Sequence, residues 1–358
     1  MTERISTLLH DEAAGVPVPV LPLGEVLAGG RAIRRRRRTG AAVASVVAAL
    51  AVVAAGTAIL GLDRPATAPE PAGLPDRTAF ERLGAWADGD EVHVGNHTAT
   101  VDGVQELQYS TAGVVVTGRD GLVLITPAGE VEPLGLHLLE SSVGPPAVAA
   151  DPVTANLAYV RALDGGRAQA VVRDLATGDE TTVGEPFGTR ESDGVDWISG
   201  DLMLVSRDGD GHAVDWRTGS PSRLPQRGWW QAAGVSVDYD ADGTWTLTSF
   251  AGDPLLTVSV DPASTYGSLS PDGRYFAVSD TEPGRLAVYE LRTGTRTVMD
   301  GRTASTYGWS PDGHLVGRST PSGSRVEVCD PATGGCERTG QTGSGQLTLV
   351  LGTPGSQL

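Results

Sequence analysis

Several common features are missing from this sequence, and each absence narrows the possible classes of protein. There is no lysine, since all 27 basic residues are arginine, a bias that reflects genome composition. Stretches with a helical period are almost absent after residue 77, which argues against a helical domain. No Gly-x-Ser-x-Gly nucleophile elbow is present, and no two of the six histidines have a helical metal-ligand spacing. We therefore assign no catalytic residue.

One long apolar run is present near the N-terminus. Residues 40–62 carry no charge, and five arginines, residues 34–38, stand directly before them. As a helix this run reaches about 35 Å, enough to cross a hydrocarbon core of about 30 Å. Because arginines beside a span stay in the cytoplasm, we predict a single-pass cell-membrane protein with a cytoplasmic N-terminus. The length of the preceding arm favours a retained anchor, with a cleaved signal peptide as the alternative.

Composition divides the chain into four segments. Residues 1–39 form a partly disordered cytoplasmic arm, residues 40–62 a transmembrane helix, residues 63–76 a proline-rich linker and residues 77–358 an extracytoplasmic domain. The arm has a net charge of +3 and residues 63–358 have −20, which together make the −17 of the chain. Because an acidic domain repels phosphate backbones, we expect no nucleic-acid partner.

Short runs of β-type residues alternate with turn clusters through the extracytoplasmic domain, which predicts an all-β fold. Two motifs repeat there in the same order. Ala-Ser-Thr-Tyr-Gly occurs at residues 263–267 and 304–308, and Ser-Pro-Asp-Gly follows at residues 270–273 and 310–313. Repeats of about 40 residues that hold four short strands are typical of the blades of a β-propeller.

A third motif marks the turn before the last strand of a blade. It is an acidic residue followed by two variable residues and Thr-Gly, and it occurs at residues 174–178, 215–219, 290–294 and 330–334, with a degenerate copy expected near residues 250–253. At roughly 40 residues per blade, the domain predicts seven blades, with six or eight as alternatives. The last strand, residues 346–351, is expected to close the ring by pairing near residues 91–95.

The repeats resemble a known family. SPDGRYFAV at residues 270–278 and WSPDGHLV at residues 309–316 are similar to the WD40-like PD40 repeat of TolB-like propellers of bacterial envelopes. The layout, with a basic arm, one span, a proline-rich linker and a propeller, resembles uncharacterised membrane-anchored proteins of actinobacteria. The resemblance implies the propeller fold, but propellers bind peptides, glycans or metals and occasionally catalyse reactions.

The two cysteines, Cys329 and Cys336, flank the last Thr-Gly turn. In a hairpin they lie opposite each other within bridging distance, so we predict a disulfide, with free thiols as the alternative. A disulfide suits an oxidising exterior. A zinc site would need further ligands, and no histidine or other cysteine is nearby.

Three aspartates have the spacing of a calcium loop. Asp238, Asp240 and Asp242 precede Gly243 in an Asp-x-Asp-x-Asp-Gly pattern, whose alternate carboxylates can converge on Ca²⁺. The twelfth position of the loop is Ser249 instead of a glutamate. We also expect Asp240-Ala-Asp-Gly to take the place that Ser-Pro-Asp-Gly has in later blades. An ordinary turn is therefore favoured over a Ca²⁺ site, and no other cofactor is predicted.

Four aromatic residues are candidates for contact with a ligand: Trp229, Trp230, Tyr266 and Tyr307. Trp229 and Trp230 are adjacent, and neighbouring side chains of an extended segment point in opposite directions, so they cannot both face the core. The two tyrosines lie in the repeated Ser-Thr-Tyr-Gly segments that lead into their blades. For all four, packing inside the fold is the favoured alternative.

Two classes of function remain. We expect a membrane-anchored, extracytoplasmic binding module for an envelope protein or a cell-wall polymer, whose arm couples to a cytoplasmic regulator or only anchors. The alternative is a calcium-dependent propeller enzyme, a lyase or lactonase-like hydrolase, which needs carboxylates gathered at the axis of the ring. The binding module is favoured because no catalytic constellation is recognisable.

Overall fold

The structure is a computed structural model of the chain, and all of its described residues belong to the second of two compact units, Pro71–Leu358. It describes residues 75–139, 148–188, 194–207, 210–222, 230–240, 242–260, 267–279, 285–300, 307–318, 325–341 and 347–350. The predicted arm and span, and the predicted linker up to residue 74, lie outside the described residues. Within the described ranges, no helix is both long and apolar enough to cross a membrane.

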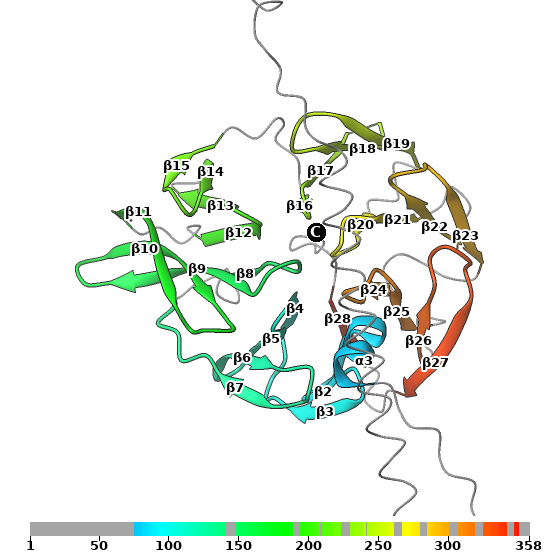
Figure 1. The fold of residues 1–358 in the computed structure, drawn as a ribbon, viewed down its shortest axis with the longest axis horizontal. Helices are drawn as coiled ribbons and strands as arrows, with labels where there is room; N and C mark the ends of the chain where they lie inside the picture. Colours follow the sequence, from blue (N-terminus) through cyan, green and yellow to red (C-terminus); the bar gives the residue numbers. More distant parts are fainter. Residues whose placement is uncertain are drawn as a thin grey trace, which may run out of the picture. The chain divides into compact units, whose positions relative to one another are not determined.

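Seven antiparallel sheets of four strands stand in a ring, which confirms the predicted all-β, seven-bladed propeller (Figure 1). We number the blades 1 to 7 and give their strands from the innermost outwards. Blade 1 holds β28 (Leu347–Leu349), β1 (Ala85–Asp88), β2 (Glu91–Val94) and β3 (His97–Thr100); blade 2 holds β4 (Glu106–Ser110), β5 (Gly113–Gly118), β6 (Gly121–Ile125) and β7 (Val131–Pro133); blade 3 holds β8 (Val148–Ala150), β9 (Asn156–Leu163), β10 (Arg167–Asp174) and β11 (Glu180–Gly188). Blade 4 holds β12 (Gly194–Ser199), β13 (Leu202–Arg207), β14 (Asp210–Asp215) and β15 (Ser220–Pro221); blade 5 holds β16 (Trp230–Ala232), β17 (Val235–Tyr239), β18 (Thr244–Ser249) and β19 (Pro254–Ser259). Blade 6 holds β20 (Gly267–Leu269), β21 (Tyr275–Ser279), β22 (Arg285–Glu290) and β23 (Arg296–Asp300); blade 7 holds β24 (Tyr307–Trp309), β25 (Leu315–Arg318), β26 (Arg325–Cys329) and β27 (Cys336–Gln341).

The ring closes because the two ends of the propeller share blade 1. β28 pairs antiparallel with β1, with Leu349 opposite Trp86. β1 in turn pairs with β2, the strand near which the sequence placed the closing contact. Every blade therefore has four strands, and the ring leaves only short outer edges unpaired.

The Ser-Pro-Asp-Gly motifs form the turns between the first and second strands of blades 6 and 7. In blade 6 the Ser270 hydroxyl donates to Asp272 at 2.6 Å and accepts the Tyr275 amide at 2.9 Å. Gly273 has a φ of +68°, which residues with a side chain rarely adopt. The repeat in blade 7 has the same serine-to-aspartate bond, from Ser310.

The Thr-Gly motifs form the turns between the third and fourth strands of blades 3, 4, 6 and 7. In blade 3, Asp174 accepts the Ala176 amide at 2.8 Å, and Gly178 takes a φ of +81°. The degenerate copy expected near residues 250–253 is the matching turn of blade 5, between β18 and β19.

The prediction for the turn that holds Asp240 and Gly243 is wrong. This turn joins the second and third strands of blade 5, β17 and β18, whereas Ser-Pro-Asp-Gly joins the first and second. The first turn of blade 5 is instead Ala233-Gly234, with φ angles of +48° and +78°. Asp-Gly suits either turn, because aspartate bonds nearby amides and glycine allows positive φ, so the dipeptide alone does not identify the position in the blade.

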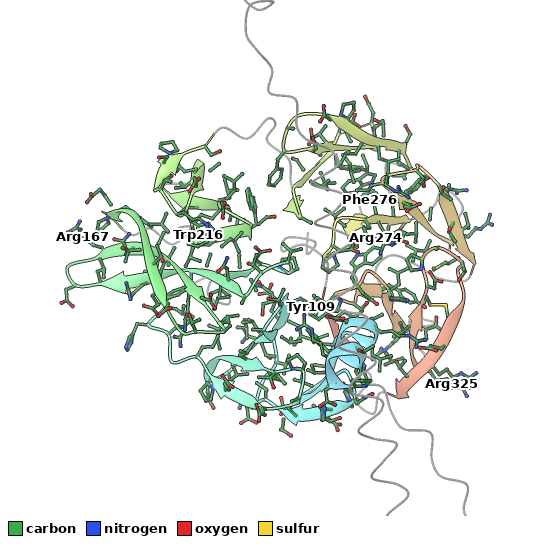
Figure 2. The ribbon with its side chains drawn as sticks, viewed as in Figure 1. Tyr109, Arg167, Trp216, Arg274, Phe276 and Arg325 are labelled. Atoms are coloured by element: carbon green, nitrogen blue, oxygen red, sulfur yellow. A yellow bond between two sulfur atoms is a disulfide. The ribbon has the colours of Figure 1, made fainter. Side chains whose placement is uncertain are left out.

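A short helix, α3 (Asp76–Leu83), precedes β1, and the sequence did not predict it. Eight residues are too few for a helical period to be recognised. Its Phe80 is fully buried and packs edge-on against Tyr109, with the ring centroids 5.8 Å apart. Tyr109 is labelled in Figure 2. The helix ends at Gly84, whose φ is +68°.

α3 bridges blades on both sides of the closing blade. Arg77 donates to the Thr111 carbonyl of blade 2 at 2.5 Å. The Asp312 amide of blade 7 donates to the Glu81 carbonyl at 3.1 Å, and Arg82 pairs with Glu337 of blade 7 at 2.6 Å. The helix therefore reinforces the ring where β28 closes it.

Apolar clusters fill the interfaces between neighbouring blades, because each middle strand sends alternate side chains to its two neighbours. Among the described residues, such clusters occupy six of the seven interfaces. Phe276, which is labelled in Figure 2, packs with Trp245 between blades 5 and 6, with the ring centroids 5.4 Å apart. The exception is the interface between blades 4 and 5.

The way the ring closes predicts that one added methyl group at Gly308 will reduce the stability of the propeller. A Cβ at Gly308 would collide with the Val350 carbonyl, which is backbone and cannot swing aside. We expect Gly308→Ala to cost about 1–3 kcal/mol, as overpacking does, and to lower the melting temperature by roughly 2–4 °C per kcal/mol. Calorimetry measures both. Gly188→Ala is the matched control, because nothing lies within 4 Å of its Cβ position, and equal melting of the two variants would contradict the closure.

Candidate functional site

The strand connections separate the two ends of the ring. We call the end with the first-to-second and third-to-fourth turns the tight-turn face, and the end with the second-to-third turns and the links between blades the loop face. α3 lies on the tight-turn face, since it bonds Thr111 and Asp312 in first-to-second turns. The propeller also ends there, because the Val350 carbonyl accepts the Trp309 amide at 3.0 Å. Neither end of the described propeller lies on the loop face.

The four aromatic candidates have different outcomes. Trp229 and Tyr266 lie outside the described residues, and Trp230 is described only through its backbone, which pairs with Val237. Tyr307 is 2% exposed, and its hydroxyl donates to Glu327 between blades 6 and 7. Tyr307 therefore has the packing role that the sequence left as its alternative.

The aspartates of the calcium pattern take part in local backbone bonds. Asp240 accepts the amides of Asp242 at 3.0 Å and Thr244 at 2.9 Å, as a turn aspartate does. Asp238 accepts the Tyr239 amide at 3.0 Å. All three are described, and their carboxylates do not meet within 4.8 Å of one another. This arrangement is that of a turn.

The predicted disulfide is confirmed. Cys329 and Cys336 are bonded across the hairpin of β26 and β27, with their Cα atoms 4.0 Å apart. Their sulfur atoms and the Glu327 carboxylate form the one potential metal-binding group in the described part of the chain. The sequence missed Glu327, because no motif marks it. In the disulfide both sulfurs are bonded to each other, so this group offers a metal a single carboxylate.

A histidine and an aspartate form an ion pair beside α3. His314 Nδ1 lies 2.7 Å from Asp312, in the first turn of blade 7. This hydrogen bond raises the pKa of His314 against the opposing effect of burial. Burial by itself would raise the pKa of Asp312, but hydrogen bonds from His314 and Ser310 outweigh it and the pKa is lowered. The pair fixes the turn that receives the helix.

Two carboxylates on innermost strands have raised pKa values. Burial raises the pKa of Glu106 at the start of β4, where the Gln108 amide donates to it at 3.0 Å. The surrounding protein also raises the pKa of Asp196 through desolvation, although its side chain keeps access to solvent. Asp196 sits at an irregularity of β12 and accepts the Ser206 hydroxyl at 2.6 Å. Shifts of this kind are frequent at functional sites. The sequence missed both residues.

The fold defines the class of protein, a seven-bladed β-propeller. No protein-family model matches the chain, and no curated protein matches it. Solved structures with WD40-like propellers are similar to it: the propeller domain of Cps50 (Swd1) from Myceliophteria thermophila (11% identity, 71% of this chain and 88% of that chain, TM-score 0.42) and Hsv2 from Kluyveromyces lactis (12%, 64% and 73%, TM-score 0.40).

A bacterial surface protein is also similar in fold. PorZ, a component of the type-IX secretion system of Porphyromonas gingivalis, matches at 11% identity over 72% of this chain, with a TM-score of 0.42. The match spans 34% of PorZ. At these identities the likeness of all three structures concerns the fold alone.

The disulfide makes stability depend on the redox state. Closing its short loop stabilises by about 2.5 kcal/mol on the chain-entropy model, so a reducing agent should lower the free energy of unfolding by that amount in denaturant titrations. The double variant Cys329→Ser/Cys336→Ser should show the same loss and no response to reductant. Unchanged unfolding after complete reduction would contradict a stabilising role.

The ion pair makes stability depend on pH in a defined window. The raised pKa of His314 gives stability that is complete below its ordinary pKa of 6.5 and lost as pH rises through the folded value. The lowered pKa of Asp312 gives stability that is complete above its ordinary pKa of 3.8 and is lost as pH falls through the folded value. His314→Gln should therefore cost about 0.5 kcal/mol, as for other partly exposed pairs, near pH 5.5, and less near pH 8.5. Denaturant titrations at both values test this, and an equal cost at both would contradict the pairing.

Proposed function

We propose that this protein is a membrane-anchored, extracytoplasmic β-propeller that binds an envelope protein or a cell-wall polymer through its loop face. The observation that carries the proposal is the position of the two ends of the described propeller. α3 and Val350 both lie on the tight-turn face, so an anchor joined to either end would connect to the propeller at that face. An anchor at the tight-turn face would not obstruct a partner that binds the loop face.

The sequence supports the anchored part of the proposal. The apolar run at residues 40–62 and the arginines at residues 34–38 are typical of a span with a cytoplasmic N-terminus. The disulfide between Cys329 and Cys336 suits an oxidising compartment. The resemblance of two blades to PD40 repeats agrees with an envelope protein of the TolB-like kind, and the arm is proposed to contact a cytoplasmic regulator.

We do not put forward the calcium-dependent lyase or lactonase-like hydrolase as a second function. That mechanism needs carboxylates that converge on a cation. Asp240 instead bonds the amides of its own turn. No other observation in the described ranges favours the enzyme.

Affinity capture with crosslinking from intact cells tests the proposal. The full-length chain is compared with one that lacks residues 1–30 and one that lacks residues 77–358. We expect partners that disappear only when the propeller is removed. Partners lost with the arm would identify the cytoplasmic regulator. If all partners were lost only with the arm, or if all three chains captured the same partners, binding by the propeller would be contradicted.

A further inference from the structure

The second strand of blade 4, β13, is less completely buried than the second strands of blades 2 and 7, and the third strand of blade 5, β18, has the alternating burial of the third strands β2 and β6. β5 of blade 2 and β25 of blade 7 are buried at every residue, because both of their faces are covered. In β13, burial alternates: Met203 and Val205 are buried, whereas Leu202, Leu204 and Ser206 are half-buried. In β18 it alternates too, with Trp245 and Leu247 buried and Thr244, Thr246 and Thr248 half-buried.

The half-buried residues of the two blades belong to the same interface. Met203 and Val205 pack in the cluster between blades 3 and 4, and Trp245 and Leu247 pack in the cluster between blades 5 and 6. Since alternate side chains of a strand point to opposite faces, the half-buried set lies on the facing sides of blades 4 and 5. We define the 4–5 interface as the half-buried Leu202, Leu204, Thr246 and Thr248 together with the buried Ser236, which lies opposite Thr248 on the same side of blade 5.

The two blades are neighbours at this interface. Their innermost strands, β12 and β16, lie in contact. The rings of Trp197 and Phe250 also meet across it, with centroids 5.7 Å apart. Phe250 is in a third-to-fourth turn, so this contact marks the tight-turn end of the interface. Apart from this contact, no apolar cluster of described residues fills the space between the middle strands of blades 4 and 5.

The blade 5 side of the interface is hydroxyl-rich and incompletely bonded. Ser236 is 2% exposed, and its hydroxyl has no hydrogen-bond partner among the described residues. Leaving a buried hydroxyl unbonded costs about 1–3 kcal/mol, so an incoming polar group would recover free energy. Thr246 and Thr248 lie on the same side, whereas Leu202 and Leu204 make the blade 4 side aliphatic.

Two carboxylates lie towards the loop-face end of the interface. Asp196 bonds Ser206, which belongs to the half-buried side of β13. Asp238 is two residues beyond Ser236 on β17 and therefore shares its side. Neither carboxylate forms an ion pair with another described residue. A cationic side chain entering from the loop face would be attracted by both.

We propose that the 4–5 interface docks an extended peptide segment of a partner protein, with an aliphatic side chain against Leu202 and Leu204 and a basic side chain near Asp196 and Asp238. This inference rests on the proposed function and names the partner class for it. Serine and threonine hydroxyls can bond the backbone of such a segment. A basic partner also matches the acidity of the domain, because residues 63–358 carry a net charge of −20.

The test uses the full-length chain in detergent micelles and a displayed library of twelve-residue peptides. We expect enriched peptides to combine arginine or lysine with leucine, isoleucine or valine. For synthetic copies of these peptides, Leu204→Arg should raise the dissociation constant at least tenfold, and so should the isosteric pair Asp196→Asn/Asp238→Asn. The loss in the second variant should shrink at high salt, because screening weakens the attraction in the unmodified protein.

Two controls separate docking from folding. Thr182→Arg adds the same charge on the exposed edge strand β11 and should leave the dissociation constant within twofold. Ser236→Ala removes a buried hydroxyl that has no described partner, so it should raise the melting temperature or leave it unchanged, while weakening peptide binding. Melting temperatures of all variants show whether each one folds.

The outcomes separate this inference from the proposed function. Peptides that bind the interface variants as tightly as the unmodified protein would overturn docking at blades 4 and 5. The proposed function as a binding module would be unaffected. Binding of soluble cell-wall fragments without any peptide would also overturn the inference and would support the polymer as the partner. Binding of neither probe would count against both.

Discussion

The pairing of β28 with β1 is the contact on which the rest of the propeller depends. A ring of sheets holds its blades in place only if the last blade meets the first, and here the three residues of β28 complete blade 1. α3 strengthens the same place by bonding blades 2 and 7 from the tight-turn face. Closure therefore brings both ends of the described propeller to the tight-turn face.

The two faces are built from different kinds of turn. On the tight-turn face, serine, aspartate and threonine side chains bond the backbone within each repeat, and glycines supply the positive φ angles, as in Ser270 to Gly273. Such turns are structural, because their polar groups are already bonded. The 4–5 interface differs, since Ser236 is buried without a described partner and the leucines of β13 are half-covered. Local departures from complete packing are expected at functional sites.

The repeats were enough to predict a β-propeller, because Ser-Pro-Asp-Gly and Asp-x-x-Thr-Gly recur at fixed places in a blade. The length of the domain favoured seven blades over six or eight. They failed at Asp240, where Asp-Gly fits two different turns. α3 was not predictable, since eight residues show no period and the helix is held by contacts with distant blades. The sequence also could not predict the roles of Asp196, Glu327 and the 4–5 interface. These depend on which strand faces meet between neighbouring blades, and sequence motifs do not contain that information.

The central claim is that partners meet the loop face, and crosslinking from defined positions tests it most directly. A photoreactive residue is placed in the full-length chain in intact cells, either at Asp240 on the loop face or at Thr333 on the tight-turn face. Both positions are exposed, so both can react. We expect a specific adduct from Asp240 and none from Thr333. An adduct from Thr333 alone would contradict the division of roles between the two faces.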